Sequence, residues 1–271
     1  MVPSEASAAS AKDAERREVV QPTDSPMRAE KPTAEVLEAA AASRVAPDQT
    51  ILVASHMLQH ASLLSSLESF GVRLIERERL APCMPDFLLS PRSCCLIRGG
   101  DFFADAGAVE ELAAQIRCAS LAFNDVLVIV VPRAGPNDEP MGDLAPADRF
   151  VQQMRAAEGR AMRALYSTLH QLPEVIMSEC SARCLECPTV HVDIDLRPQE
   201  ESLASLPGLN AFVAADIVKR MPHDEFLRLP AEAMLAAFPV LSPGAVQTLQ
   251  DALGCSAAVE TPAAPRGRQG E

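Results

Sequence analysis

The sequence predicts an α/β domain built around a mixed sheet, followed by an all-α region. Up to residue 131, short apolar segments of strand length alternate with segments whose apolar residues recur at helical spacing. After residue 202 the apolar spacing is helical throughout, and prolines divide it into short helices. The 271-residue chain is 48% hydrophobic, which is enough to form a core.

The sheet is predicted from the order of its elements. Strands are expected at 51–54, 72–75, 87–89, 94–97 and 126–131, and helices at 58–70 and 108–119. The turn Ser90-Pro91-Arg92-Ser93 joins the third and fourth strands as a hairpin. Residues 126–131 are β-branched except for Leu127, which is typical of a central strand covered on both faces. A mixed sheet that contains a hairpin is therefore expected.

Later segments complete the predicted organisation. We expect a loop at 132–146, a long amphipathic helix at 146–169, a strand at 175–177, a short helix ending at Pro188, and strand character at 190–196. The predicted parts are a disordered arm at 1–48, an α/β domain at 49–188, a linker at 189–201, a helical domain at 202–255 and a disordered tail at 256–271.

Composition and charge disfavour several classes of protein. The net charge of −13, with Tyr166 as the single Tyr and no Trp, disfavours a protein that coats nucleic acid or stacks on its bases. No apolar run reaches the ~20 residues that a membrane span needs. The N-terminal segment lacks an apolar core and is partly acidic, which disfavours a targeting signal. The eight cysteines are then expected to be free thiols in a reducing compartment.

The strongest local motif lies in the helical region. Residues 203–215 have the pattern helix, Pro207-Gly208 turn, helix, and residues 235–246 repeat it. This is the helix-hairpin-helix pattern, in which a tight turn presents backbone N–H groups that can hold a DNA phosphate.

Because two helix-hairpin-helix patterns follow an α/β domain, the chain resembles the XPF-type structure-specific endonuclease superfamily over roughly residues 50–253. In that family a restriction-nuclease-like α/β domain precedes tandem helix-hairpin-helices, and members work as heterodimers on branched DNA. The segment 85–91 matches the first strand and turn of the nuclease signature, but Leu96-Ile97-Arg98 stands where Glu-Arg-Lys is usual. The acid of the first strand would fall near Ala54, so only Asp86 and Arg98 match.

A metal-dependent nuclease needs several carboxylates, so the resemblance implies the catalytically inactive branch of the family. That branch includes the non-catalytic partner of XPF, the small Fanconi-anaemia-associated XPF-like subunit and the shortage-in-chiasmata (Zip-type) meiotic proteins. Residues 71–78 are most similar to the meiotic group and 85–95 to the Fanconi-associated subunit, so both remain open. The resemblance implies a nuclear heterodimer subunit with no catalytic residues and no cofactor, which helps bind branched or junction DNA in meiotic recombination or repair, away from membranes.

The resemblance assigns DNA contact to two groups of residues. Gly208, Asn210 and Ala211 form the first turn, and Lys219 and Arg220 follow on the next helix. Asn210 replaces a usual glycine but tolerates positive φ. In the second turn, Val240 and Ser242 replace both glycines, which argues against close phosphate approach there.

Two other functions stay open. Residues 200–255 carry three Lys/Arg against seven Asp/Glu, which favours a protein interaction scaffold without DNA contact. A nucleotide-binding enzyme that uses the α/β sheet is the third hypothesis, but the sequence contains no phosphate-binding loop.

Three groups of potential metal ligands are better explained by packing or exposure. Cys180, Cys184, Cys187 and His191 have spacings that suit zinc, but the same spacing lines one helix face, so we predict a buried face and no metal. His191, Asp193 and Asp195 would share one face of a strand, where an exposed edge is the simpler interpretation. His56 and His60 lack the glutamate of a zinc protease and are expected to be surface helix residues.

Overall fold

The computed structural model describes residues 49–134, 140–141, 143–158, 162–184, 187, 190–195 and 197–259. The predicted arm at 1–48 and the end of the predicted tail lie outside the described residues. In the part of the chain that is described, no helix is long and apolar enough to cross a membrane.

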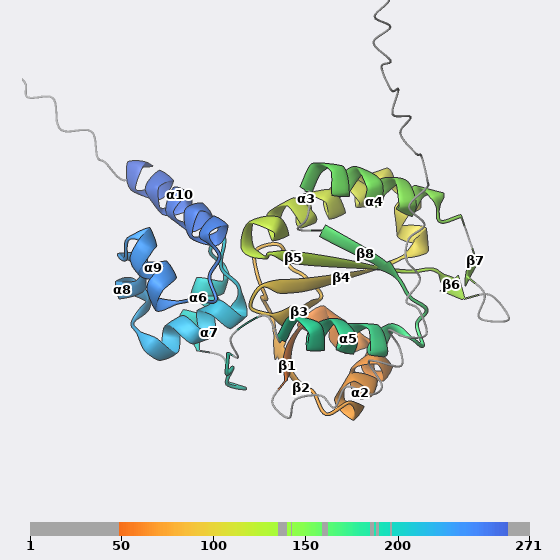
Figure 1. Cartoon of the computed structure of the whole chain (residues 1–271), viewed down its shortest axis with the longest axis horizontal. Coiled ribbons are helices and arrows are strands. Elements are labelled where there is room, and N and C mark those ends of the chain that lie inside the picture. The colour runs from red at the N-terminus through yellow and green to blue at the C-terminus, as the bar shows by residue number, and fades with distance from the viewer. Residues whose placement is uncertain are drawn as a thin grey trace, which may run out of the picture.

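A six-stranded mixed sheet forms the centre of the molecule, which confirms the predicted α/β class (Figure 1). The strand order is β2-β1-β3-β4-β5-β8, and β3 alone runs antiparallel to its neighbours. The strands are β1 (Thr50–Ala54), β2 (Arg73–Arg77), β3 (Phe87–Ser90), β4 (Ser93–Gly99), β5 (Asp125–Val131) and β8 (Met162–Tyr166). Because the other strands are parallel, their carboxyl ends meet at one edge of the sheet, where β3 begins.

The predicted hairpin is confirmed by the register of β3 and β4. Leu88 pairs with Cys94, and the chain turns at Pro91 and Arg92. Strand β5 lies between β4 and β8, and its residues from Val126 to Val130 are fully buried. A continuous apolar segment therefore became a strand that is covered on both faces, as its composition predicts.

Helices cover both faces of the sheet. One face carries α3 (Ala106–Ala122) and α4 (Ala145–Glu158), and the other carries α2 (Ala61–Ser69) and α5 (Leu172–Cys184) (Figure 1). Alternate residues of β5 belong to two different buried clusters: Val128 packs in the cluster that contains α3, and Ile129 in the one that contains α5. Short segments connect these elements: η1 (Ser55–Gln59), η2 (Gly100–Ala104), β6 (Arg133–Ala134) and β7 (Pro140–Met141).

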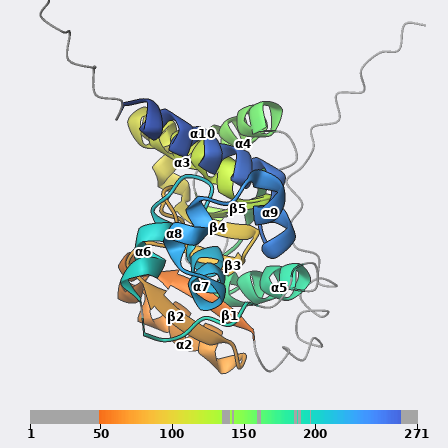
Figure 2. The same cartoon turned by 90° about the vertical axis from the view of Figure 1, so that its left-hand side faces the viewer.

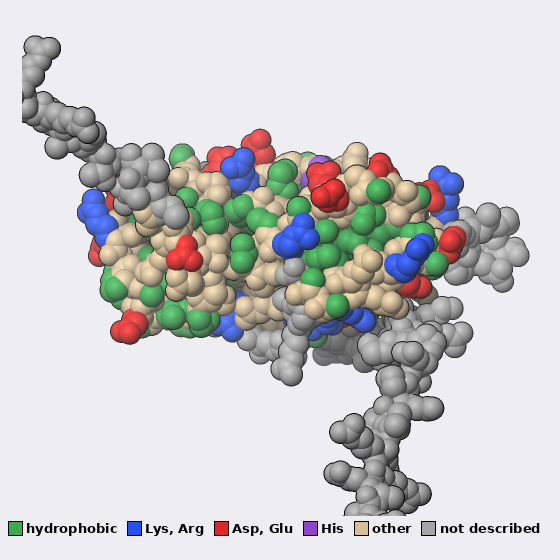
Figure 3. Space-filling view, turned by 90° about the horizontal axis from the view of Figure 1, so that it is seen from above, with side chains coloured by type: hydrophobic (Ala, Val, Ile, Leu, Met, Phe, Trp, Pro, Cys, Tyr) green, Lys and Arg blue, Asp and Glu red, His purple; other side chains and the backbone are tan. Residues whose placement is uncertain are grey.

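The region after residue 197 is helical, as predicted, and packs against one end of the sheet domain (Figure 2). Its helices are α6 (Pro198–Ala204), α7 (Ala211–Arg220), α8 (His223–Leu227), α9 (Ala231–Ala237) and α10 (Pro243–Val259). Helix α10 lies beside α3, and both contribute with α4 to a face on which apolar side chains alternate with scattered charges (Figure 3). Phe212 and Phe238 of the helical region belong to the same buried cluster as Leu88 and Leu96 of the sheet.

A buried ion pair joins the helical region to the sheet. The Nε of Arg77, at the end of β2, donates to Oε1 of Glu200 in α6 over 2.9 Å, and both side chains are almost fully buried. Arg77 also donates to the carbonyl oxygens of Asp193 and Ile194. The segment predicted as a linker at 189–201 is therefore attached to β2 through these contacts, and α6 begins inside it at Pro198.

Three predicted elements were wrong. The helix expected at 146–169 ends at Glu158, and the chain returns as strand β8, in which every second residue, Met162 and Ala164, is buried on one face. The strand expected at 175–177 lies within helix α5. The described residues 190–195 form no strand, so His191, Asp193 and Asp195 do not share a strand face. Helix α10 also continues to Val259, into the segment predicted as a tail.

Candidate functional site

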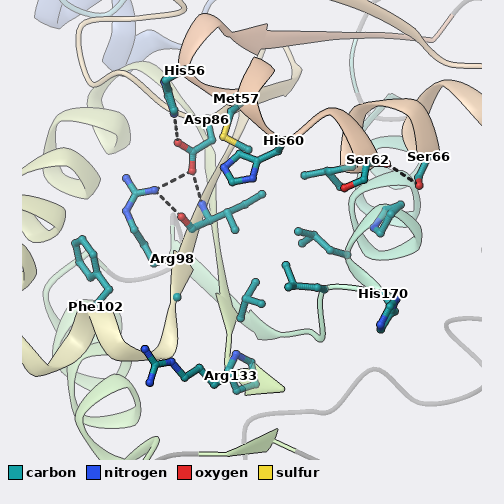
Figure 4. A pocket seen from close by; sticks show the side chains of 18 of the residues that line it. His56, Met57, His60, Ser62, Ser66, Asp86, Arg98, Phe102, Arg133 and His170 are labelled. Atoms are coloured by element: carbon teal, nitrogen blue, oxygen red, sulfur yellow. Dashed lines mark hydrogen bonds and ion pairs between the residues drawn. The ribbon is translucent and has the colours of Figure 1, made fainter. Parts of the chain in front are cut away.

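A large cavity opens at the edge where the carboxyl ends of the parallel strands meet (Figure 4). Its volume is about 1210 Å³, and residues that follow β1, β4, β5 and β8 line it. Ligand sites of open α/β sheets lie at this edge, because loops rather than helix faces surround it. The cavity is therefore the primary candidate for a functional site.

The Asp86 side chain lines this cavity and is almost fully buried, at 4% exposure. Its Oδ1 accepts a hydrogen bond from Nε2 of His56 over 2.8 Å. Its Oδ2 accepts from the backbone N–H of Ile97 over 2.5 Å and from Nη1 of Arg98 over 2.8 Å. The antiparallel direction of β3 explains this convergence, since Asp86 precedes β3 at the edge where β1 and β4 end.

The Arg98 guanidinium is fixed in place on several sides. Its Nη2 donates to Oε1 of Gln115 in α3 over 2.9 Å, and its Nη1 donates to the carbonyl oxygen of Ile97. The guanidinium carbon also lies 5.6 Å from the ring centroid of Phe102. Arg98 therefore supplies Asp86 with a positioned counterion, which leaves the carboxylate poorly available as a metal ligand or a general base.

The described residues place few carboxylates near Asp86. Glu111 of α3 is the other acidic residue among those that line the cavity. Ala54, near which the family resemblance places a metal-binding acid, adjoins Asp86 and donates its N–H to the Asp86 carbonyl oxygen over 3.1 Å. In the described part of the chain, no three His, Cys, Asp or Glu side chains are grouped so that they could hold a metal ion.

The walls of the cavity are mostly apolar. They include Met57, Leu63, Met84, Ile97, Phe102, Val131, Pro132, Leu169, Leu172 and Pro173. Basic side chains are spaced among them: His60 and His170, with Arg133 ion-paired to Asp101. The site is thus a hollow of apolar character with a neutralised carboxylate at its base.

The predicted surface position of His56 and His60 is confirmed, but the structure adds a contact that was not predicted. His56 lies at the surface in part, but its ring binds the buried Asp86, so it is a component of the cavity. His60 is exposed, as predicted, and also lines the cavity. The two residues lie in η1 and directly after it rather than in a regular helix. Their position just after a predicted parallel strand was the signal in the sequence that could have located them.

The turn predicted to bind DNA is closed in the structure. Asn210 and Ala211 are buried, and Oδ1 of Asn210 accepts from the N–H groups of Phe212 and Val213 over 3.1 and 3.2 Å. The N–H of Ala211 donates to the carbonyl oxygen of Leu80 over 2.8 Å. The N–H groups that were expected to hold a phosphate are therefore already used within the protein.

Two further features show that this turn is enclosed by the rest of the protein. The Asn210 side-chain N–H donates to the carbonyl oxygen of Pro91 in the β3–β4 turn over 2.9 Å. Gly208 has a φ of +81°, and a Cβ placed there would lie 2.3 Å from the carbonyl oxygen of Ala245. Packing against the sheet domain and α10 thus encloses Gly208, Asn210 and Ala211, and their contact with DNA stays a prediction.

Lys219 and Arg220 lie at the other end of α7, away from this turn. Lys219 donates to the carbonyl oxygen of His191 over 2.7 Å and to Oδ1 of Asp193 over 3.3 Å. The hydrogen bond from Lys219 lowers the pKa of Asp193. Arg220 pairs with Asp216 over 2.8 Å and donates to the carbonyl oxygen of Ala237. Both cations therefore already have acidic partners.

The cysteine segment is described only in part. Cys180 is fully buried in α5, and its thiol lies against the carbonyl oxygen of Leu89, in agreement with the predicted buried face. The side chain of Cys184 lies outside the described residues. His191 is exposed.

Comparisons with known proteins give similarities but no family assignment. No family model matches the chain, and no curated protein matches it. Among solved structures, XPF from Aeropyrum pernix in complex with DNA matches at 17% identity and a TM-score of 0.39, covering 76% of this chain and 98% of that chain. XPF from Aeropyrum pernix also matches at 18% identity and a TM-score of 0.40, covering 75% of this chain and 97% of that chain. At TM-scores below 0.5, these matches establish neither a shared fold nor a shared activity.

Proposed function

We propose that the chain is a non-catalytic XPF-like subunit of the nucleus. It pairs with a second XPF-like subunit and helps that partner bind branched DNA in meiotic recombination or DNA repair. The observation that carries the non-catalytic part is the state of Asp86, whose two oxygens are occupied by donors from His56, Ile97 and Arg98.

The physical argument concerns charge. A metal-dependent nuclease holds its cation with several carboxylates, and that cation activates water and balances the phosphate charge. Here the guanidinium of Arg98 takes the place of a cation beside Asp86, and Ala54 supplies no second carboxylate. A divalent cation would have to displace Arg98 and bind to one buried carboxylate, which is an unfavourable exchange.

The partner and the DNA contact rest on the sequence resemblance. The helical pairs α6–α7 and α9–α10 support the proposed tandem helix-hairpin-helix arrangement, since each is joined by a short turn. With the turn at Gly208 closed, Lys219 and Arg220 remain the proposed DNA contacts of this region.

A cleavage assay tests the proposal. The purified full chain is incubated with flap and branched DNA in the presence of Mg²⁺ or Mn²⁺, alone and with a partner isolated by tagged pull-down. We expect no cleavage by the chain alone, and no effect of Asp86→Asn on any cleavage by the complex. Asp101→Asn is the matched control. Metal-dependent cleavage that Asp86→Asn abolishes while thermal denaturation shows the variant folded, and that Asp101→Asn preserves, would overturn the non-catalytic assignment.

A second function, a protein interaction scaffold without DNA contact, is favoured by the closed turn and by the ion pairs of Lys219 and Arg220. Fluorescence anisotropy with labelled branched DNA separates the two functions. Binding that is lost in the Lys219→Ala/Arg220→Ala double variant supports DNA contact. No binding with or without the partner supports the scaffold.

A further inference from the structure

We infer that the cavity at the carboxyl edge of the sheet is a docking site for an extended segment of a partner protein. The segment would insert an apolar side chain between the walls and place an acidic residue against the histidines of the rim. This inference goes beyond the proposed function and does not depend on DNA binding.

The distribution of exposed apolar side chains is the first observation. Among the described residues, the large exposed hydrophobic side chains are Leu58, Met84, Leu121, Leu169 and Ile194. Met84 and Leu169 line the cavity, at 54% and 66% exposure, and Leu58 lies in η1 directly after Met57, which also lines it. Exposed apolar side chains that gather around a hollow mark a protein interaction site, because burying them there is favourable.

The extent of the cavity is sufficient for a polypeptide segment. Pockets for small molecules usually enclose about 300–1,000 Å³. This cavity is about 1210 Å³, and its walls come from η1, α2, β4, η2 and the segment before α5. The labelled side chains of His60, Arg133 and His170 are spread widely around it (Figure 4). A chain with an inserted anchor residue fits such an extended hollow.

The polar groups of the cavity indicate which polar residue the docked segment would carry. The arginines of the lining are already paired, Arg98 with Asp86 and Arg133 with Asp101, so its remaining donors are the histidines. His60 and His170 lie on the exposed rim and can donate to a carboxylate. An acidic residue beside the apolar anchor can therefore accept hydrogen bonds from these two histidines.

The same lining is less suited to nucleic acid. Arg98 is held by Asp86 and Gln115, and Arg133 is paired with Asp101 over 2.7 Å. Phe102 is the one aromatic ring of the lining besides the histidines, and Arg98 lies over it. Sites for single strands combine cations along the backbone with several rings on which bases stack.

The rim residue Met84 suits a variable partner side chain. Its φ of 45° is in the left-handed region, which non-glycine residues rarely adopt, and its side chain is exposed beside the cavity. Methionine has a flexible and polarizable side chain, so it adapts to anchors of different shape.

A peptide selection tests the inference. A phage-displayed library of random peptides is selected on the full chain, and enriched peptides are synthesised with a fluorescent label. We expect the enriched peptides to share an apolar residue next to Asp or Glu. We expect Leu169→Glu and Met84→Glu to weaken their binding by about tenfold or more in anisotropy, as loss of an anchoring contact does. Leu121→Glu, an exposed leucine of α3 outside the cavity lining, is the matched control and should not change the affinity.

The outcomes distinguish a partner peptide from other possible occupants of the cavity. Because all three substituted residues are exposed, thermal denaturation should show unchanged folding. The inference is overturned if no peptide family is enriched, or if binding is the same in Leu169→Glu and wild type. It is also overturned if the two rim substitutions abolish binding of a labelled single-stranded oligonucleotide and leave peptide binding intact. Self-association that Leu169→Glu removes would instead assign the cavity to a second copy of this chain.

Discussion

Two regions of the molecule hold a buried side chain of the Asp/Asn type, and they differ in what lies beside it. Asp86 precedes a strand and binds donors from three residues, while a large cavity remains open next to it. Asn210 precedes helix α7, is fully buried, and makes hydrogen bonds within the protein through both its Oδ1 and its Nδ2. The turn at 207–211, whose pattern predicted DNA binding, is thus packed against the rest of the protein. Asp86, which was identified only by the family resemblance, lines an open cavity.

The difference teaches that local pattern determines local geometry, while tertiary packing determines access. The turn at 207–211 has the glycine and the helix start that its sequence predicts. Its donors point to the carbonyl oxygens of the sheet domain rather than to solvent.

The largest effect is expected at the ion pair that fastens the helical region to the sheet. Arg77→Ala leaves Glu200 buried without its partner, and burial already raises the pKa of Glu200. We expect the free energy of unfolding to fall by about 3–5 kcal/mol in urea denaturation. Arg197→Ala removes an exposed pair with Asp193 and should change stability by less than about 1 kcal/mol. Equal effects of the two substitutions would show that the buried pair does not hold the regions together.

The next effect concerns Asp86 itself. If it neutralises Arg98, Asp86→Ala leaves a mostly buried guanidinium without its counterion and should reduce the free energy of unfolding by about 3 kcal/mol. The control is Asp101→Ala, which breaks the exposed pair with Arg133. A stable Asp86→Ala protein would indicate that the carboxylate is kept for binding and not for packing.

Two glycines with positive φ test how closely α10 approaches the turn at Gly208. Gly208 and Gly71 have φ values of +81° and +83°, but a Cβ on Gly71 meets open space and one on Gly208 meets the backbone of Ala245. We expect Gly71→Ala to cost about 1 kcal/mol from backbone strain, and Gly208→Ala about 2–3 kcal/mol because the packing must also shift. Thermal and urea denaturation measure both. Similar costs would contradict the close approach of α10 to the turn.

The smallest effect is a change in thiol reactivity without a large change in stability. A hydrogen bond with Cys83 lowers the pKa of Cys118 to about 7, while the same bond and burial raise the pKa of Cys83. Since the thiolate is the reactive form, alkylation of Cys118 by iodoacetamide should rise through neutral pH. Cys83→Ala should move this rise to higher pH, as followed by mass spectrometry. An unchanged pH profile in Cys83→Ala would exclude the bond as the cause.

The sequence allowed the sheet to be predicted where strands are buried on both faces, as at 126–131. It failed at β8, because the apolar residues of 162–166 fit a helical continuation of α4 as well as a strand. The strand that flanks β5 depends on pairing with Val126 to Val130, a contact that no local pattern contains.

The candidate site was predicted in part. Asp86 and Arg98 were identified by resemblance, and their meeting follows from the antiparallel strand β3. His56 was correctly assigned to the surface, but its bond to Asp86 was missed because the two residues lie thirty positions apart in the sequence. The burial of Asn210 depends on the β3–β4 turn and on Leu80, so it could not be inferred from the hairpin motif alone.

Titration of the full chain with Mn²⁺ tests most directly whether Arg98, and not a metal ion, is the counterion of Asp86. Binding is followed by calorimetry and by the paramagnetic broadening of the His56 ring signals. Because the guanidinium already occupies the carboxylate, we expect no saturable binding at millimolar Mn²⁺ and the same trace for Asp86→Asn. A stoichiometric, saturable site that broadens His56 and is lost in Asp86→Asn would contradict the non-catalytic assignment.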